Sequence, residues 1–292
     1  MPPQSDNLRG SLMMIAAMAA FTANDACMKA ITETLPLFQA IVLRGALTML
    51  ALAVIAPRLG GLRLRFSRSD ARAIGWRTLG EVAGTVTFLL ALRQMPLANL
   101  SAIMQSLPLA VTLGAALVFG QTFGWRRMGA ILVGFVGVLL IVRPGTEGFD
   151  RWAVLGLASV GFVVLRDLAT RALSPEVPSV AVAFVSALAV TLMGLTVMPF
   201  DGWVSPPSDT LALTALAAVF LVMGYLFVVM ATRVGDVGVV APFRYTALVF
   251  ALVLGWLAFG QFPDALTLTG SAIVVATGIY AFQRERRLAR RG

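Results

Sequence analysis

Long apolar runs with few charged residues make up most of the chain. A helix of about 20 mainly apolar residues crosses the ~30 Å hydrocarbon core of a bilayer, and the runs have this length. Segments such as ALTALAAVFLVMGYLFVVMAT (212–232) do not alternate between polar and apolar residues, as the strands of a transmembrane barrel do. The pattern predicts an all-α integral membrane protein with ten transmembrane helices: 11–31, 36–57, 73–92, 96–119, 126–143, 152–171, 178–200, 210–232, 237–259 and 264–283.

Composition supports this fold class. Hydrophobic residues make up 59% of the 292 positions, charged residues make up 13%, and the mean hydropathy is +0.87. These values are too apolar for an ordinary soluble domain. The N-terminal segment MPPQSDNLRG has only Arg9 before the first apolar run, and no convincing cleavage site follows that run. We therefore expect a retained first helix rather than a signal peptide that is removed.

Arginines in the connecting segments predict how the spans are oriented. Cytoplasmic loops carry an excess of basic residues, and arginines cluster in the segment 58–72 and in the tail 284–291. The segment PFDGWVSPPSDT (199–210), on the opposite side, contains two aspartates and no basic residue. Both termini are therefore expected to be cytoplasmic. The net charge of +9 then reflects topology, so nucleic acid is not an expected partner.

The inventory of reactive side chains is small. Cys27 is the single cysteine and the chain has no histidine. A disulfide within the chain, imidazole metal sites and Ser-His or Cys-His catalytic pairs are therefore excluded. An enzyme would have to work with carboxylates, hydroxyls and arginines only. We expect no enzymatic activity, no cofactor and no metal.

The two halves of the chain repeat each other. A shift of 142 positions aligns Asp25 with Asp167 and Lys29 with Arg171, and a shift of 140 positions aligns two FGQ segments further along. Each half holds five predicted spans, an odd number, so the second half must enter the membrane from the opposite side. Such inverted repeats recur in secondary transporters, whose substrate sites lie between the repeats. We expect two five-helix repeats, residues 1–145 and 146–292, joined through RPGTEGFDR (143–151).

The repeated charges are spaced for pairing. Asp25 and Lys29 are four residues apart and share one face of a helix, and so do Asp167 and Arg171. One hypothesis is that the two pairs are gates near opposite mouths of one pathway, each stabilising closure on its own side. The alternative is that each pair only neutralises buried charge within its own helix.

Other polar residues within the predicted spans also need an explanation, because they are costly in a bilayer. Arg44 fits either a cation held by acidic neighbours or carbonyls, or a group that binds a substrate carboxylate. Arg77 and Glu81 are interpreted as an ion pair. Arg244 follows Pro242, which frees backbone groups nearby, and is a stronger functional candidate.

One pair of equivalent positions is polar in both halves. At a shift of 140, Gln105 corresponds to Tyr245, which places a hydrogen-bonding group at the same point of each half. Pro108 lies close to the first position as Pro242 lies close to the second. We expect irregular backbone at both places.

Three segments resemble a known family. FQAIVLRG (38–45), PLANLSAIMQSLPL (96–109) and the stretch that starts APFRYTALV (241–249) are similar to segments of the EamA-domain carriers of the drug/metabolite transporter (DMT) superfamily. Within it, the chain most resembles the YddG-type amino-acid exporters. The resemblance implies a basket-shaped helical bundle with a central cavity. It also implies these cavity residues: Asn24, Asp25, Glu81, Gln105, Arg166, Asp167, Arg244 and Tyr245.

The resemblance also implies a function. It predicts a multi-pass protein of the bacterial inner membrane that works as a monomer and exports amino acids. An arginine would bind the carboxylate of the amino acid, a carboxylate or carbonyl group would bind its ammonium, and apolar surroundings would tolerate varied side chains. Related carriers often have Glu where this chain has Gln121 and Gln261, which removes two protonation sites. The alternatives are a carrier of a flavin or another metabolite, a scaffold, and an intramembrane enzyme.

Overall fold

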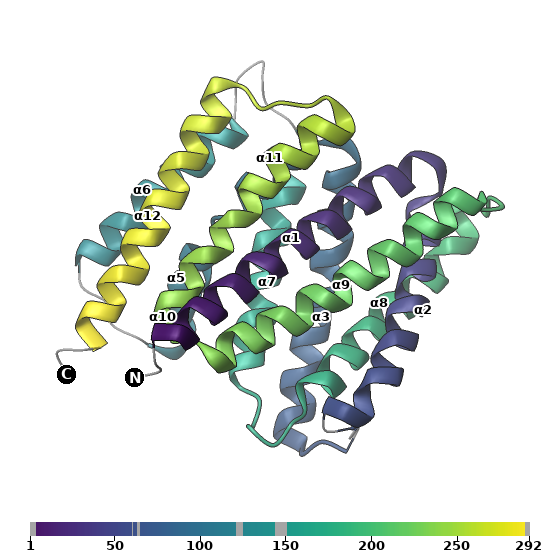
Figure 1. Ribbon diagram of the computed structural model, residues 1–292, viewed down its shortest axis with the longest axis horizontal. Helices are drawn as coiled ribbons and strands as arrows, with labels where there is room; N and C mark the ends of the chain where they lie inside the picture. Colours follow the sequence, from purple (N-terminus) through teal and green to yellow (C-terminus); the bar gives the residue numbers. More distant parts are fainter. Residues whose placement is uncertain (1–3, 60, 63–64, 121–124, 144–150, 290–292) are drawn as a thin grey trace.

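The computed structural model describes residues 4–59, 61–62, 65–120, 125–143 and 151–289, and all regular structure within them is helical. This confirms the predicted all-α class for the described residues. Figure 1 shows long helices side by side, with the start of α1 and the end of α12 at the same end of the bundle. The elements are α1 (Gln4–Thr34), α2 (Leu37–Ile55), η1 (Ala56–Leu59), α3 (Arg68–Gln94), α4 (Leu97–Met104), α5 (Leu107–Phe119), α6 (Trp125–Val142), α7 (Arg151–Arg171), α8 (Ser179–Asp201), α9 (Ser208–Val234), α10 (Val237–Val240), η2 (Ala241–Tyr245), α11 (Thr246–Phe259) and α12 (Ala265–Ala289).

Eight helices within the described residues are long and apolar enough to cross a membrane. Two predicted spans, 73–92 and 126–143, are not among them. The first lies in α3, which is long enough but carries Arg77 and Glu81, and the described apolar part of α6 is shorter than a span. The count of ten spans and the cytoplasmic location of the termini therefore stay predictions.

Two of the predicted spans are each divided into shorter helices. α4 ends at Met104 and α5 begins at Leu107, because Pro108 has no N–H to donate to the carbonyl of Met104. The corresponding break in the second half is wider. There, α10, the 3₁₀-helix η2 and α11 follow one another, with Pro242 inside η2. The irregular backbone predicted near both prolines is confirmed.

The repeated FGQ segments end two helices in the same way. Gly120 follows α5 with a φ of 65°, and Gly260 follows α11 with a φ of 63°. Only glycine adopts this left-handed conformation without a steric penalty. The predicted junction 143–151 and Gln121 fall mainly or wholly outside the described residues. The division into two repeats therefore stays a prediction.

Four pairs of long helices make the main contacts of the bundle. α1 packs against α9, α3 against α7, α2 against α8, and α6 against α12. In Figure 1, α1 and α9 lie in front of α3 and α7, while α6 and α12 run together at one edge. The last pair approaches most closely at Gly137 and Gly270, where a Cβ atom on either glycine would meet the carbonyl of the other.

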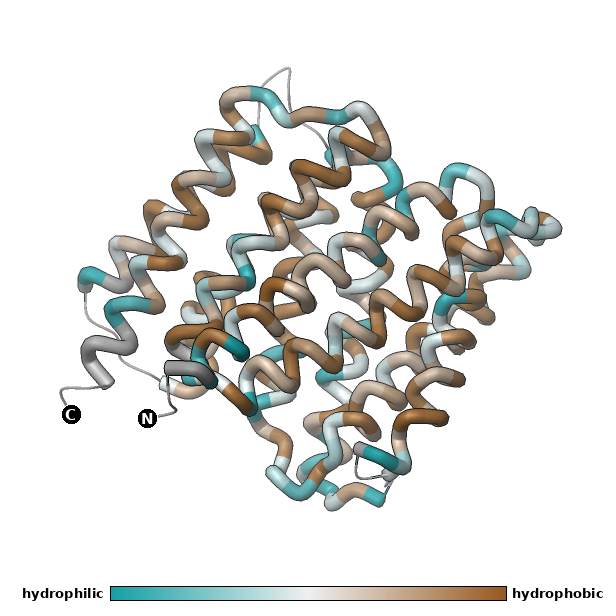
Figure 2. Tube along the Cα trace, in the orientation of Figure 1, coloured by the Kyte–Doolittle hydropathy of each residue, from teal (hydrophilic) through white to brown (hydrophobic). Residues whose placement is uncertain are grey.

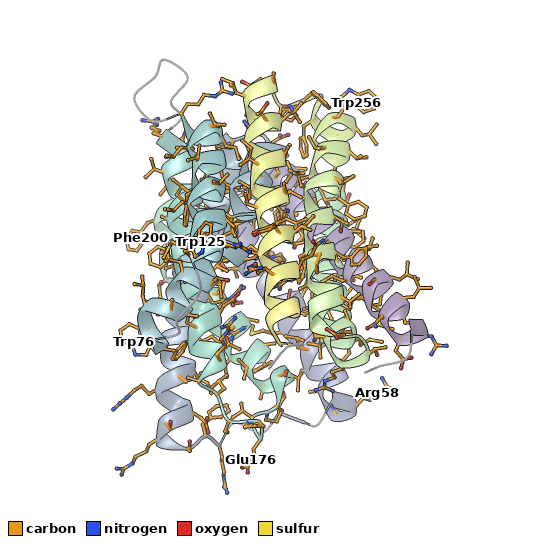
Figure 3. The ribbon with its side chains drawn as sticks, turned by 90° about the vertical axis from the view of Figure 1, so that its left-hand side faces the viewer. Arg58, Trp76, Trp125, Glu176, Phe200 and Trp256 are labelled. Carbon is orange, nitrogen blue, oxygen red and sulfur yellow. The ribbon has the colours of Figure 1, made fainter. Side chains whose placement is uncertain are left out.

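We name the two ends of the bundle after residues found there. The Lys29 end holds the turns between α1 and α2 and between α3 and α4, and the Arg171 end holds the connection between α7 and α8. In Figure 3, Trp256 marks the Lys29 end at the top, and Arg58 and Glu176 mark the Arg171 end at the bottom. Figure 2 shows that hydrophobic residues predominate along the long helices between these ends, as expected of helices that cross a bilayer.

Candidate functional site

A cavity of about 380 Å³ lies inside the bundle, and both α1–α9 and α3–α7 contribute to its wall. This volume is typical of small-molecule sites. Helices α2, α4, α5, α8 and α11 complete the wall, together with η2. Most of the lining is apolar, and the charged residues that line it are Asp25, Arg44, Glu81, Arg166 and Arg244.

Gly80 brings α3 and α7 close enough to join their charges. A Cβ atom at this position would lie 2.6 Å from the carbonyl oxygen of Phe162 and 2.8 Å from the backbone nitrogen of Arg166. Both distances are too short for real contacts, so only glycine fits without moving a helix. Because Glu81 is the next residue, this close approach places its carboxylate beside Arg166.

Glu81 is the centre of a charge network. Its Oε2 lies 3.5 Å from Nη1 of Arg77 and 3.6 Å from Nη1 of Arg166. Arg166 also pairs with its neighbour Asp167 at 2.9 Å, and Arg77 donates a hydrogen bond to the Ser186 hydroxyl on α8. The predicted Arg77–Glu81 ion pair is confirmed. The network is larger than predicted, because one carboxylate serves two arginines from different helices.

Asn24 connects the charges on the opposite side of the cavity. Its Nδ2 donates to Oδ1 of Asp25 at 2.9 Å, and its Oδ1 accepts a hydrogen bond from Nη1 of Arg44 at 3.3 Å. Arg44 is buried, and its Nε has no hydrogen-bond partner in the described part of the chain. Asn24 thus holds a carboxylate on α1 and a guanidinium on α2 next to each other. Arg44 has the polar partner that one interpretation required, and it also lines the cavity.

Arg244 is bonded differently from the other arginines of the cavity. It lies in η2, where the break at Pro242 turns the backbone away from a regular α-helix. Its side chain lines the cavity but forms no hydrogen bond and no ion pair within 4 Å to any described residue. Its charged neighbours are Asp167 and Arg166, at longer range. Arg244 therefore presents a guanidinium whose donors are available to a solute.

The break between α4 and α5 supplies uncharged polar groups. Gln105 is buried and lines the cavity, together with Ser101 one turn earlier. Ser106 is turned away from the cavity, because its hydroxyl donates to the carbonyl of Ile103 at 2.7 Å. This side of the cavity can therefore donate and accept hydrogen bonds without adding charge.

The structure brings together six of the eight predicted cavity residues. These six line the cavity: Asn24, Asp25, Glu81, Gln105, Arg166 and Arg244. Asp167 is not part of the lining and acts through its ion pair with Arg166. Tyr245 is also outside it: the side chain is buried against Gly278 of α12, where a Cβ atom would overlap the tyrosine hydroxyl. The equivalence of Tyr245 with Gln105 in sequence does not extend to the cavity.

The predicted pairing within the two charge clusters is wrong. Lys29 does not pair with Asp25, because its ammonium donates to the carbonyls of Leu92 and Met95 at 2.8 and 2.7 Å. Asp167 pairs with Arg166, and Arg171 is exposed at the end of α7. In both cases a partner at another position offers better geometry than the residue four positions away. Whether these residues act as gates is a separate question.

Several cavity residues were not in the predicted set. Tyr225 lines the cavity, and its hydroxyl lies 3.5 Å from Oε1 of Glu81, while its ring meets the edge of the Phe21 ring at a centroid distance of 5.4 Å. Ser186 was missed because a single serine in an apolar helix carries no signal. Tyr225 did carry a sequence signal, because a shift of 140 positions aligns it with Thr85 and places a polar residue at this point of both halves. Both residues line the cavity.

Fold and cavity together define a polytopic helical membrane protein with a cavity inside the bundle that is lined partly by charged and polar residues. Comparison with family models identifies the class. Residues 8–143 and 150–282 each match the EamA-like transporter family. The chain belongs to this family, which is part of the DMT superfamily, and it is a membrane transporter.

Relatives of similar length carry different solutes. The chain is 27% identical to the pseudopaline exporter CntI of Pseudomonas aeruginosa, over 92% of this chain and 94% of that protein. It is 24% identical to an S-adenosylmethionine uptake transporter of Rickettsia conorii, over 97% and 96%. It is 28% identical to a riboflavin transporter of Vibrio cholerae, also over 97% and 96%. These relatives are all transporters of small molecules, in agreement with a transport function.

A solved structure shows the same fold. A protein of known crystal structure superposes with a TM-score of 0.66 over 96% of this chain and 98% of its own, at 19% sequence identity. This likeness supports the arrangement of the helices.

Proposed function

We propose that the chain exports amino acids, including aromatic and neutral ones, across the bacterial inner membrane by alternating access. The protein would act as a monomer and use two inverted repeats. The solute would be transported without chemical change. The support comes from the charges and the lining of the cavity, taken together with the family.

Arg244 is the observation that carries the proposal. A guanidinium without a hydrogen-bond or ion-pair partner is costly at membrane depth, because a charge removed from water needs compensation. A carboxylate of the solute would supply it, through charge-assisted hydrogen bonds. On the cavity wall, Arg44, Arg166 and Arg244 also outnumber the acidic residues Asp25 and Glu81, which favours a solute that brings a negative group.

Asp25 is the complementary group for an ammonium. Its carboxylate accepts one hydrogen bond from Asn24 and lines the same cavity as Arg244. An α-amino acid carries a carboxylate and an ammonium on adjacent atoms, so the two subsites together would bind its backbone. The remaining wall is largely apolar and includes Phe88 and Met104, which suits side chains of varied size.

The contacts between helices support the two-repeat arrangement. If α1, α2, α3 and α6 correspond to α7, α8, α9 and α12, the contact of α1 with α9 becomes the contact of α7 with α3. Under the same correspondence, the α2–α8 contact and the α6–α12 contact each map onto themselves. This pattern is expected of two halves related by a two-fold axis, and alternating access follows when such halves rock against each other.

A flavin carrier is the second candidate. Three aromatic side chains line the cavity, Phe21, Phe88 and Tyr225, and a ring system could stack on them. One relative is the riboflavin transporter of Vibrio cholerae. A neutral flavin would leave Arg244 without a carboxylate, so we place this candidate second.

Flux through purified protein in liposomes tests the proposal. The assay would measure uptake of labelled phenylalanine, leucine, glutamate and riboflavin, with unlabelled solute inside to drive exchange. We expect exchange of the amino acids, and no exchange of phenylalaninamide, which lacks the carboxylate. Arg244→Ala should lower amino-acid flux about 100-fold, the loss expected for one hydrogen-bonded charge pair of ~2–3 kcal/mol.

Two further variants make the result specific. Arg244→Lys keeps the charge but not the two-pronged geometry, and should retain a measurable part of the flux. Arg233→Ala removes an exposed arginine of α9 outside the cavity and should leave flux unchanged. Riboflavin exchange without amino-acid exchange would overturn the substrate assignment and favour the second candidate. If amino acids are exchanged, the direction of transport would be tested in intact cells by measuring the release of preloaded amino acid.

A further inference from the structure

The Lys29 end of the bundle contains a buried cation. Lys29 is 5% exposed, and its ammonium bridges two backbone carbonyls at the C-terminus of α3, those of Leu92 and Met95. Carbonyls at a helix C-terminus lack partners within the helix and carry partial negative charge, so they bind a cation well. The bond joins α1 to the α3–α4 turn. Around it, Met28, Ile31 and other side chains form a packed apolar cluster.

The Arg171 end has the same parts but not the bond. Arg171 is the residue equivalent to Lys29, and it is exposed, with no hydrogen bond or ion pair to any described residue. The carbonyls equivalent to those of Leu92 and Met95 belong to Thr232 and Gly235, at the C-terminus of α9. Within the described residues, the hydrogen bonds between elements do not use these two carbonyls.

The carbonyl pairs at the C-termini of α3 and α9 have the same backbone geometry. Met95 ends α3 with φ −103° and ψ 153°, and its N–H donates to the carbonyl of Ala91 at 2.8 Å. Gly235 ends α9 with φ −101° and ψ 162°, and its N–H donates to the carbonyl of Ala231 at 3.1 Å. A site that binds a cation at one end of the bundle is thus present at the other end without one.

We propose that Lys29 and Arg171 are alternating latches. In the conformation described here, Lys29 closes its end of the bundle. In the opposite conformation, Lys29 leaves the α3 carbonyls, and Arg171 binds the carbonyls of Thr232 and Gly235, which draws the end of α7 onto the end of α9. This inference rests on the alternating access of the proposed function and adds the residues that set the balance between its two states.

The proposed latches do not need Asp25 or Asp167 as ion-pair partners of Lys29 and Arg171. Asp25 and Asp167 are engaged with Asn24 and Arg166, two residues that line the cavity, so both carboxylates stay paired there while the cations act at the two ends. A hydrogen bond from a charged donor is stronger than one between neutral groups. Two such bonds at one end are enough to shift the population of states at least tenfold.

Thiol labelling measures this shift without any solute. Cys27 is the only cysteine, is 8% exposed and lies two residues from Lys29, so it reports opening of the Lys29 end in the natural chain. Ala187→Cys in a Cys27→Ala background reports the Arg171 side, since Ala187 lines the cavity on α8. The protein would be held in lipid nanodiscs and reacted with a charged maleimide.

The two latch variants should act in opposite directions. Lys29→Met should raise the labelling rate of Cys27 about tenfold or more and lower that of the cysteine at position 187. Arg171→Met should lower the labelling rate of Cys27. Lys29→Arg should behave like the natural chain. Matched controls are Arg93→Met and Arg233→Met, exposed arginines in the last turns of α3 and α9, which should change neither rate.

Each outcome decides the inference. Unchanged Cys27 labelling in Lys29→Met overturns it, and so does an Arg171→Met variant that raises this labelling. If Lys29→Met unfolds, both reporters react faster, which the latch does not predict, and the exposed Arg171 variant then carries the test alone. A failure of all amino acids in the flux assay, with opposite labelling shifts, would remove the substrate assignment and keep the latch.

Discussion

The helix pairs α1–α9 and α3–α7 cross in the same way but carry different chemistry. In α3–α7, a Cβ atom at Gly84 would touch Val163 at 3.4 Å. The equivalent positions in α1–α9 are Gly224 and Phe21, and a Cβ atom at Gly224 would meet the Phe21 ring at 2.7 Å. Both crossings therefore have a glycine on one helix and an apolar side chain on the other, at matching positions of the two halves.

Two charged cavity positions of one pair are neutral in the other. Glu81 and Arg166 of α3–α7 correspond to Leu221 and Asn24 of α1–α9, and all four line the cavity. The aligned positions of the two helix pairs thus share their packing and differ in their polar groups. A symmetric cavity would offer a solute two equal orientations. This one has the Glu81 charge network on one side and, on the other, a carboxylate and a guanidinium joined by the Asn24 amide, which favours one orientation.

Gly80→Ala should have the largest effect, because it acts on backbone atoms. The added methyl would overlap the carbonyl of Phe162 and the nitrogen of Arg166, and neither helix can yield locally. We expect a destabilisation of about 4 kcal/mol, above the usual range for overpacking, and loss of transport because Arg166 moves away from Glu81. Thermal unfolding in detergent and the flux assay would measure both.

Two glycine controls calibrate this result. Gly224→Ala meets the ring of Phe21, a side chain that can rotate, and should cost only ~1–2 kcal/mol. Gly75→Ala, in α3 with no atom within 4 Å of the new methyl, should be neutral or stabilising by up to ~1 kcal/mol. Equal melting temperatures for Gly80→Ala and Gly75→Ala would show that the close approach of α3 and α7 does not control stability.

Glu81→Gln should have the next largest effect and should separate charge from shape. It leaves Arg77 and Arg166 without the carboxylate between them, and removal of one partner from a buried ion pair costs about 3 kcal/mol. The equivalent change in α9, Leu221→Gln, adds an amide to the cavity wall and should cost under ~1.5 kcal/mol. Equal melting temperatures for Glu81→Gln and Leu221→Gln would show that the ion pairs of Glu81 do not stabilise α3–α7 more than the apolar contacts of Leu221 stabilise α1–α9.

What the sequence predicted well depends on neighbours along one helix. The apolar spans, the ion pair of Arg77 with Glu81 and the helix ends at the FGQ segments all follow from spacing within a few residues. The breaks at Pro108 and Pro242 are local for the same reason, because a proline lacks an N–H wherever it occurs.

What it missed depends on contacts between distant segments. Lys29 bonds to carbonyls 63 and 66 positions away, and Tyr225 reaches Glu81 across 144 positions. Backbone carbonyls have no sequence signal, so spacing along the helix pointed to an acidic side chain, Asp25, as the partner of Lys29. The prediction that Tyr245 lines the cavity was wrong for a related reason. Its equivalence with Gln105 gives its position along the chain but not the direction of its side chain.

A pH dependence of stability should appear at the start of α3. Asp70 accepts hydrogen bonds from the backbone N–H and hydroxyl of Ser174 and from the hydroxyl of Ser67. These donors, the Ser174 N–H first, lower the pKa of the Asp70 carboxyl below its ordinary value. A lowered pKa means that this stabilisation is complete above the ordinary pKa of about 4. It is lost as the pH falls through the folded-state pKa.

Melting temperatures between pH 6 and pH 2.5 would reveal this contribution. Asp70→Asn should melt a few degrees lower than the natural chain at pH 6, and the difference should shrink in the acid range. A constant difference between the Asp70→Asn variant and the natural chain across the whole range would contradict the assignment.

The smallest effect is expected where α1–α9 has its counterpart of this contact. Thr210 of α9 corresponds to Asp70, and its hydroxyl lies 3.4 Å from the hydroxyl of Thr34 on α1. Two neutral hydroxyls at this distance form only a weak hydrogen bond. Each hydroxyl also has another acceptor nearby: the carbonyl oxygen of Ile31 for Thr34, and Oδ1 of Asp209 for Thr210. Thr210→Val should therefore cost under ~0.5 kcal/mol at every pH. A shift as large as that of Asp70→Asn, measured by the same melts, would mean that the two helix pairs are held at their ends by equal forces and that the asymmetry is confined to the cavity.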